Sequence, residues 1–355
     1  MLLGGSGREM SESTFPADRG VGLNGVFISW VGHHGRSDAI AKLLGIDAVF
    51  LPRRRGGLGV FTSYPRQFIQ TVITIRRRKP SVVILMLPPL PALLALLVSL
   101  RSTKSVVADL HTGFFHDPKW RWAKPVSLRL LKSAGLLVTN EALARLCSPN
   151  DRGAVVLHDI LTLPQTAELT VCVSRKPSLL FPLSYANDEP VDELMEAARR
   201  LPEIEFVFTG SAPGTVRESA PENVRFTGFI DEISYWREVS AAWGMGALTT
   251  RGDTMQRAGY EALLCNKPIL TSDHEVLEEF FESAAVYVAP DAKAIADGIT
   301  QLISDRARLM QEGTRILKIR RAEQAVALES TRRLIREILS QSIRNHQTVD
   351  EAGEA

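Results

Sequence analysis

Short apolar runs alternate with amphipathic stretches along most of the chain. The run GVFISWV at 25–31 is followed by a helical pattern at 35–45, and then by further apolar runs at 47–52, 81–87, 104–111, 136–140 and 154–159. Helical patterns fill the gaps at 65–80, 91–100, 124–135 and 140–147. Strands that are apolar on both faces are typical of a parallel sheet covered by helices on each side. The pattern therefore predicts an α/β fold.

The alternation pauses at 161–177 and then begins again. Strand patterns recur at 178–186, 205–213, 223–231, 245–250, 267–272 and 284–290, and 306–340 reads as one long charged helix. We predict two Rossmann-like domains facing across a cleft, with ligands at the carboxyl ends of the strands. The expected divisions are a disordered leader at 1–23, an N-terminal domain at 24–165, a C-terminal domain at 170–315, a helix packing back at 316–342 and a disordered tail at 343–355.

Residues 81–100 carry no charge over a length that could span a bilayer. However, Pro88, Pro89 and Pro91 interrupt the segment, and proline is best placed in the first turn of a helix. The prolines favour a buried strand followed by a separate helix over a membrane span.

Composition adds two constraints. The three cysteines, Cys147, Cys172 and Cys265, are far apart, which favours a reduced, cytoplasmic protein without disulfides or a zinc site. The net charge is only +2, yet residues 48–108 hold ten Lys and Arg and no Asp or Glu. Such a stretch favours an anionic partner, namely phosphate, lipid or nucleic acid, and is otherwise a solvated basic face.

The loop VGHHGRSD at 31–38 lies between the first strand and its helix. Gly32 and Gly35 would let the backbone approach an anion, beside His33 and Arg36, and the helix N-terminus would supply free N–H groups. The alternative is that these glycines only form a tight turn. We treat the four residues as a candidate phosphate or acceptor loop.

A histidine ends the strand VVADLH at 106–111. At the carboxyl end of a parallel strand His111 would face a ligand, where it could act as a base or hold the ligand by a hydrogen bond. Asp109 and Asp117 are further candidate catalytic acids or bases, and His116 is another. The alternative is a purely structural histidine.

The stretch TTRGDTMQRAGYEALLCN at 249–266 reads as a strand end, a glycine loop and a helix starting near Asp253 or Thr254. Glu261 would then lie about two turns further along the same side. Arg251 and Arg257 could neutralise a diphosphate at the helix N-terminus. Alternatively, Asp253 is a plain N-cap and Glu261 an exposed helical acid.

The order of these pieces resembles the GT-B glycosyltransferases, over about residues 25–340. The C-terminal half is similar to the family with an acid–seven residues–acid motif, here Asp253 and Glu261, although both acids are usually Glu. The resemblance implies that Asp253 contacts the donor sugar and Glu261 the ribose. It also implies donor contacts by Thr254 and Met255 and by two glycine turns, FTGSAP at 208–213 with Gly210 and VRFTGFID at 224–231 with Phe229.

The N-terminal half resembles the β-1,4-mannosyltransferases that extend lipid-linked chitobiose. The likeness is carried by Gly35-Arg36-Ser37, by the Pro-Pro pair before a Leu-rich helix, and by Asp109-Leu110-His111. It departs from the retaining family members in one place, because PLSYANDEPVDE at 182–193 contains no basic residue. This absence favours inversion. The lack of an acid pair like DxD at a strand end favours a metal-independent enzyme without a cofactor.

These features together predict a metal-independent hexosyltransferase. It would move a sugar from a GDP- or UDP-linked donor to a lipid-linked or polysaccharide acceptor in glycan or exopolysaccharide biosynthesis. We expect a cytoplasmic protein, peripheral at the inner face of the membrane through the basic region 53–79, with no nucleic-acid partner. The alternatives are a non-catalytic protein that binds nucleotide sugars, and a nucleotide-sugar epimerase.

Overall fold

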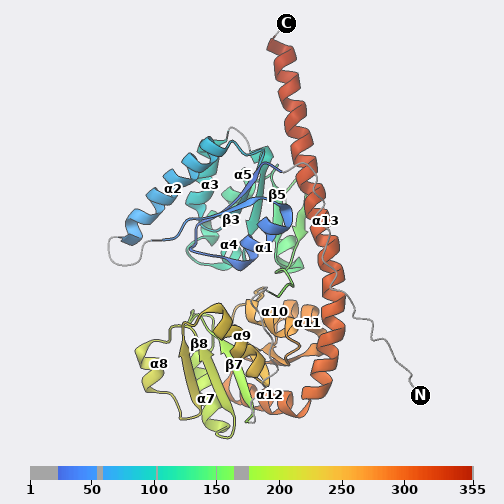
Figure 1. Ribbon diagram of the computed structural model, residues 1–355. Helices are drawn as coiled ribbons and strands as arrows, with labels where there is room; N and C mark the ends of the chain where they lie inside the picture. Colours follow the sequence, from blue (N-terminus) through green and yellow to red (C-terminus); the bar gives the residue numbers. More distant parts are fainter. Residues whose placement is uncertain (1–22, 54–58, 101–102, 149, 164–175, 354–355) are drawn as a thin grey trace, which may run out of the picture.

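The structure is a computed structural model, and it describes residues 23–53, 59–100, 103–148, 150–163 and 176–353. The chain forms two lobes, each built around a six-stranded parallel sheet, as Figure 1 shows. The expected two-domain α/β architecture is therefore confirmed. The expected leader at 1–23 lies almost wholly outside the described residues.

The N-terminal sheet has the strand order β2-β1-β3-β4-β5-β6. Its strands are β1 (Gly25–Ser29), β2 (Asp47–Phe50), β3 (Val82–Leu87), β4 (Val106–Leu110), β5 (Gly135–Val138) and β6 (Ala154–Val156). The central strands β3, β4 and β5 are almost completely buried, as their continuous apolar runs predict.

The C-terminal sheet has the order β12-β11-β10-β7-β8-β9. Its strands are β7 (Ser178–Pro182), β8 (Glu205–Thr209), β9 (Val224–Gly228), β10 (Gly244–Ala247), β11 (Ile269–Ser272) and β12 (Ala285–Val288). The direction of the strand order reverses between the neighbouring strands β7 and β10. The loops that follow these two strands lie at the same edge of the sheet. Ligands of open α/β sheets bind at such a switch point.

Helices cover both faces of each sheet. In the N-terminal lobe they are α1 (Gly35–Leu44), α2 (Gly59–Arg78), α3 (Leu90–Ser99), α4 (Thr112–His116), α5 (Lys124–Leu130) and α6 (Glu141–Arg145). In the C-terminal lobe they are α7 (Val191–Arg200), α8 (Gly214–Glu218), α9 (Glu232–Ala241), α10 (Arg257–Leu264), α11 (Glu275–Phe281) and α12 (Ala292–Ser304). Three 3-10 turns complete the set: η1 (Thr103–Ser105), η2 (Arg121–Ala123) and η3 (Glu282–Ala284).

The hydrophobic core shows which helices share a face of the N-terminal sheet. Side chains of α2, α3 and α5 pack in one cluster with alternate residues of the strands. Side chains of α1 and of the C-terminal helix pack on the opposite face. The layer of α2, α3 and α5 is therefore the outer wall of this lobe, as the ribbon also shows (Figure 1).

Helix α13 (Arg306–Gly353) runs along both lobes and packs back on the N-terminal one (Figure 1). Ile316 belongs to the core of the C-terminal lobe, whereas Leu334 and Ile338 pack against the N-terminal sheet. A Cβ on Gly135 would lie 2.9 Å from Leu334, so this glycine allows the helix to approach β5. The helix begins at Arg306, as the charged pattern at 306–340 predicts, so its first ten residues fall within the expected C-terminal domain. It continues past residue 342, where a disordered tail is expected, because no proline or glycine interrupts 314–352.

Several short elements differ from the sequence-based expectation. Helices α4, α8 and α11 were not predicted, because five to seven residues carry too little periodicity. The segment 81–100 divides into β3 and α3 at its prolines, as expected. Among the described helices, none has both the length and the apolar character needed to cross a bilayer.

Candidate functional site

The two lobes meet at the loop between β10 and α10. The backbone carbonyl of Asp253 accepts hydrogen bonds from Asn140 Nδ2 at 2.9 Å and from Thr112 Oγ1 at 3.3 Å, both from the N-terminal lobe. Its carboxylate lies 3.1 Å from Nε2 of His116, without the alignment of a hydrogen bond. Asp253 therefore sits where the strand ends of both sheets converge.

Asp253 is not part of a helix, contrary to the expectation. It has a left-handed backbone (φ 57°), and α10 begins only at Arg257, after the N-cap Gln256. The Gln256 side chain donates to the Leu248 carbonyl and so holds the loop against the strand end. The argument that Asp253 and Glu261 share one side of a helix is therefore wrong. Glu261 lines the cavity between the lobes, whereas Asp253 lies at the contact between them.

His111 stands at the strand end as predicted, and its Nε2 lies 2.9 Å from Oδ2 of Asp109. Asp109 itself is 0% exposed and accepts a bidentate contact from Arg36. Its Oδ1 lies 2.9 Å from Nη2 and 3.2 Å from Nε of Arg36, and its Oδ2 lies 3.3 Å from the same Nε. Burial raises the pKa of Asp109, but Arg36 and His111 outweigh it and hold this pKa well below its usual range. Asp109 is therefore a permanent carboxylate that orients His111.

Two predicted roles need correction here. Asp109 cannot be a base for a substrate, because no part of it reaches the cleft. Arg36 does not present its guanidinium to a phosphate. The guanidinium is paired with Asp109, donates to the Leu157 carbonyl at 2.5 Å and lies 3.6 Å from the Asp159 carboxylate. Both residues position the loop and His111, since a buried ion is stable only when it is paired.

His34 completes this cluster. Its ring lies edge-on to His111, with ring centroids 5.0 Å apart, and Nδ1 accepts from the Ser37 backbone N–H at 3.4 Å as the N-cap of α1. Burial and the neighbouring His111 lower the pKa of His34 to about 4, so it is neutral near pH 7. Of the two adjacent histidines in this loop, the second caps the helix. His33 packs on Phe50 instead.

Asp117 follows the one-turn helix α4, where its Oδ1 accepts the Lys119 backbone N–H at 2.9 Å. It is part-buried and makes this turn contact, while His116 of the same turn points to Asp253. Of the two, His116 is the residue that the structure brings to the junction of the lobes.

Glu261 is 8% exposed and both of its carboxylate oxygens are engaged. Arg257 Nε lies 2.7 Å from Oε1, and the Tyr235 hydroxyl donates to Oε2. Burial, together with the nearby Glu261 charge, raises the pKa of Tyr235 well above its ordinary value. The alternative of an exposed helical acid is thereby excluded. Tyr235 was missed, because only the fold brings α9 beside α10.

Arg257 also joins the two lobes. Its guanidinium lies directly over Gly35 at the start of α1, so a side chain at position 35 would occupy the same space. Gly35 is thus required for a close approach across the cleft, as its place in the predicted loop suggests. A Cβ at Gly32 would only reach ordinary van der Waals contact with Pro52, at 3.8 Å, so Gly32 makes no comparable approach.

The remaining donor-site candidates lie on loops at the carboxyl edge of the C-terminal sheet. Gly210 has φ 83° and a Cβ there would clash with the Leu183 carbonyl. Phe229 follows β9 and is 90% exposed. Nη2 of Arg251 lies 3.4 Å from Oδ1 of Asp188. The Thr254 hydroxyl donates a hydrogen bond to the Gly252 carbonyl of its own loop. Met255 is partly buried and packs against the core, and its contact with the donor stays a prediction.

The loop after β7, which contains no basic residue, is held by one of its own carboxylates. The Glu189 carboxylate accepts the backbone N–H groups of Ser184 and Ala186 and the Ser184 hydroxyl, at 3.0–3.1 Å. An internal carboxylate thus takes up these loop donors. The cations near this loop come from other segments: Arg251 contacts Asp188, and Arg217 of α8 lies close enough to Tyr185 to oppose the rise in its pKa that burial causes.

A cavity of about 710 Å³ lies between the lobes. Its walls include His33, Gly35, Arg36 and Lys42 from the N-terminal lobe and Glu232, Trp236, Arg257, Tyr260 and Glu261 from the C-terminal lobe. This volume is in the range of small-molecule sites. It brings together the predicted loop at 31–38 and the predicted acid on α10.

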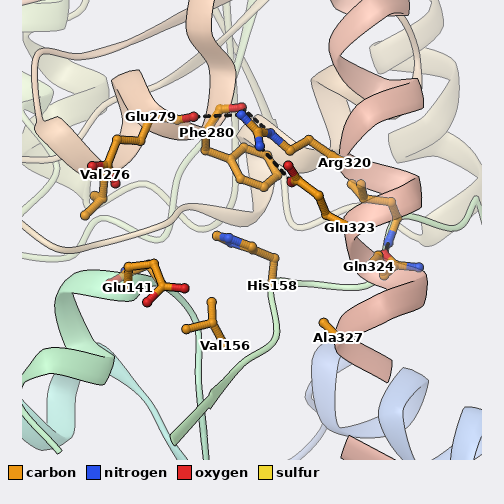
Figure 2. Close-up of a pocket in the computed structure, with 12 residues that line it drawn as sticks. Glu141, Val156, His158, Val276, Glu279, Phe280, Arg320, Glu323, Gln324 and Ala327 are labelled. Atoms are coloured by element: carbon orange, nitrogen blue, oxygen red, sulfur yellow. Dashed lines mark hydrogen bonds and ion pairs between the residues drawn. The ribbon is translucent and has the colours of Figure 1, made fainter. Parts of the chain in front are cut away.

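A second cavity, of about 330 Å³, lies beside α13 and is drawn in Figure 2. His158 points into it from the chain after β6, and its ring is tilted against the Phe280 ring, with the centroids 4.5 Å apart. Arg320 of α13 pairs with Glu323. None of the predicted site residues lines it. Among the described residues, no group of three or more His, Cys, Asp and Glu side chains is arranged to hold a metal ion.

Two facing Rossmann-like lobes with an inter-lobe cavity and a crossing C-terminal helix define the GT-B class of proteins. Residues 176–305, the C-terminal lobe, match the family described as Glycosyl transferases group 1. The expected resemblance to GT-B glycosyltransferases is thus confirmed, while the narrower likeness to the chitobiose mannosyltransferases stays a prediction. A search of the curated proteins finds no match to the chain.

Solved structures show the same fold at low sequence identity. HepE from Anabaena in complex with UDP and glucose is 15% identical, with a TM-score of 0.60, over 92% of this chain and 99% of that one. Sucrose-phosphate synthase from Thermosynechococcus elongatus is 15% identical, with a TM-score of 0.64, over the same shares. A UDP-N-acetylglucosamine 2-epimerase from Listeria monocytogenes, described as putative, is 12% identical, with a TM-score of 0.54, over 82% and 90%.

Proposed function

We propose that this protein is a glycosyltransferase that takes its sugar from a UDP-linked donor. The observation that carries the proposal is the inter-lobe cavity, in which Glu261 and Arg257 of α10 face the 31–38 loop. The match of the same lobe to the group 1 glycosyl transferases supports it. Uridine is chosen over guanosine because HepE is described with UDP and with UDP-glucose.

In the proposed reaction the ribose hydroxyls bind Glu261, and Phe229 offers an exposed ring to the base. Arg257 and Arg251 balance the diphosphate, because charge-assisted contacts are strongest where charge develops on the leaving group. Asp253 is at the junction of the lobes and contacts the donor sugar. No metal or cofactor is part of the proposal.

His111 is the proposed base. Asp109 holds Nε2, which leaves Nδ1 as the nitrogen free to take the proton of the acceptor hydroxyl. The acceptor oxygen then bonds to the sugar carbon while the bond from that carbon to the diphosphate oxygen breaks, and the electron pair leaves with the nucleotide. Attack from the face opposite the leaving group inverts the sugar carbon.

The proposed acceptor is a lipid-linked or polysaccharide glycan, which places the reaction in glycan or exopolysaccharide biosynthesis. The basic region 53–79 supports a location at the inner face of the cytoplasmic membrane. Among the described arginines of this region, Arg66, Arg76 and Arg77 are exposed. Anionic lipid attracts such a cluster.

The proposal is tested by ligand binding before any acceptor is known. UDP should raise the melting temperature of the wild-type protein, and GDP should raise it less, since a ligand of the folded state stabilises it. Glu261→Ala should abolish the UDP shift, whereas Glu278→Ala, an exposed acid on α11, should retain it. Equal shifts with all nucleotides, or none with any, would contradict the nucleotide site.

An epimerase is the second candidate, favoured by the structural likeness to the Listeria protein. Incubation of the protein with UDP-N-acetylglucosamine alone distinguishes the two. An epimerase converts it to a second sugar nucleotide without any acceptor, whereas a transferase releases UDP only when an acceptor or water takes the sugar. Binding of UDP-sugars without either change would identify the third alternative, a non-catalytic binding protein.

A further inference from the structure

The outer wall of the N-terminal lobe exposes an unusual amount of apolar surface. Ten large hydrophobic side chains are exposed among the described residues, and seven of them lie on this one layer of helices. They are Ile69 and Ile73 on α2, Leu94 and Val98 on α3, and Trp122, Val126 and Leu130 on η2 and α5. Single exposed hydrophobic residues are ordinary, whereas their concentration on one face marks an interaction surface.

Helical spacing places these side chains together on the outward side of each helix. Arg66, Ile69, Ile73 and Arg76 follow each other at intervals of three and four residues, which puts them on one stripe of α2. A similar stripe on η2 and α5 is formed by Trp122, Val126 and Arg129, which are four and three residues apart. Because α2, α3 and α5 cover the same side of the sheet, the three stripes belong to one face (Figure 1), which we call the α2–α3–α5 face.

The charge of this face has a single sign. Residues 48–140 hold 15 of the 42 Lys and Arg of the chain and only two of its 40 Asp and Glu. Asp109 is buried, and Asp117 belongs to the turn after α4 beside the junction of the lobes. The α2 and α5 stripes therefore combine apolar side chains with arginines and contain no carboxylate.

We propose that the α2–α3–α5 face docks on an anionic phospholipid bilayer. Apolar side chains interleaved with cations fit the boundary between headgroups and acyl chains, where the cations meet lipid phosphates. A nucleic acid would use the cations but leave the isoleucines, valines and the tryptophan in water. A second copy would bring two positive faces together, which repel.

This inference extends the proposed membrane contact from the region 53–79 to α3 and α5, and it does not depend on the transfer reaction. Tyr64 and Phe68 of that region are partly buried and pack against the core, so neither belongs to the exposed apolar set. The exposed aromatic residue of the face is Trp122, which is 68% exposed. The docking contact therefore includes residues well beyond the basic run.

The experiment is co-sedimentation of the full chain with phosphatidylcholine vesicles, with and without phosphatidylglycerol. We expect binding only to the anionic vesicles, weakening as salt is added. Each Lys or Arg near an anionic surface is worth about fivefold in affinity. The triple variant Arg66→Gln/Arg76→Gln/Arg129→Gln should therefore bind roughly a hundredfold more weakly.

Matched controls keep the test specific. Arg217→Gln/Arg237→Gln/Arg321→Gln removes three exposed arginines from the C-terminal lobe and the adjoining part of α13, and it should bind as the wild type does. Val126→Asp should weaken binding at least tenfold, whereas Val326→Asp on α13 should not, although Val326 is as exposed as Trp122. Circular dichroism and the UDP shift report whether each variant is folded.

Four results would overturn the proposal. The first is equal binding to vesicles with and without phosphatidylglycerol, and the second is an equal loss in the two triple variants. The third is a wild-type protein that binds DNA more tightly than vesicles. The fourth is a wild-type dimer that Val126→Asp makes monomeric. None of these outcomes bears on the nucleotide site, so failure here and failure of the proposed function are separate findings.

Discussion

The buried pair of Arg36 and Asp109 provides the sharpest test of the structure. Asp109 is 0% exposed and Arg36 3%, and their side chains make two-pronged contact at 2.9–3.3 Å. Asp109→Asn removes the charge while keeping the size, and so leaves a buried guanidinium without its main counter-ion. Breaking a buried pair in this way costs about 3–5 kcal/mol. Asp159 remains 3.6 Å from Arg36, which places the expected loss near the low end, about 3 kcal/mol.

Urea unfolding followed by circular dichroism measures this loss. The midpoint should fall while the slope against urea stays unchanged, since the surface exposed on unfolding is the same. Asp47→Asn is the matched control, because it breaks the solvent-exposed pair of Asp47 with Arg78 and should cost less than about 1 kcal/mol. Equal losses in the two variants would refute the assignment of Asp109 as a buried, ionised partner of Arg36.

Three further predictions follow from single sites. Gly210→Ala should lower the unfolding free energy by at least about 2 kcal/mol, because a left-handed residue gains a Cβ against the Leu183 carbonyl, whereas Gly252→Ala, with open space around it, should be nearly neutral in the same urea titration. Tyr235→Phe should weaken UDP binding in calorimetry by about tenfold, since Glu261 loses its hydroxyl donor. Burial, then repulsion by Arg36 and Arg320, lowers the pKa of His158 to about 3 from 6.5. Only the unfolded chain takes up this proton between those values, so stability should fall as the pH drops from 7 to 4, and His158→Asn should remove up to about 1.4 kcal/mol per pH unit of that slope.

Much of the fold follows from the sequence, because parallel strands buried on both faces leave continuous apolar runs. The predicted helix at 35–45 ends at Gly45 in the left-handed conformation expected of a C-cap, and Pro88 and Pro89 separate β3 from α3. Short helices such as α4 and α11 could not be predicted, since one or two turns lack a readable period.

The candidate site was less predictable, because its chemistry depends on pairs that only the fold brings together. Arg36 and Asp109 are 73 positions apart, and the sequence around each residue does not show that they form an ion pair. Likewise, Tyr235 reaches Glu261 across the packing of α9 and α10. Asn140 is a partial exception, because an Asn between a strand and a helix is a recognisable N-cap, and its amide is the group that reaches Asp253.

The charges around the inter-lobe cavity show how donor binding and lobe closure can be linked. Arg257 is paired with Glu261 and lies over Gly35, while Arg251 is paired with Asp188. Both cations of the proposed diphosphate site thus already hold a carboxylate, and the loop after β7 holds another. Only Nε of Arg257 is paired with Glu261, so a nucleotide diphosphate can engage the Nη1 and Nη2 groups, which lie over Gly35, while Glu261 keeps its contact. Because the same guanidinium touches the opposite lobe, binding the donor and adjusting the contact between the lobes become one event.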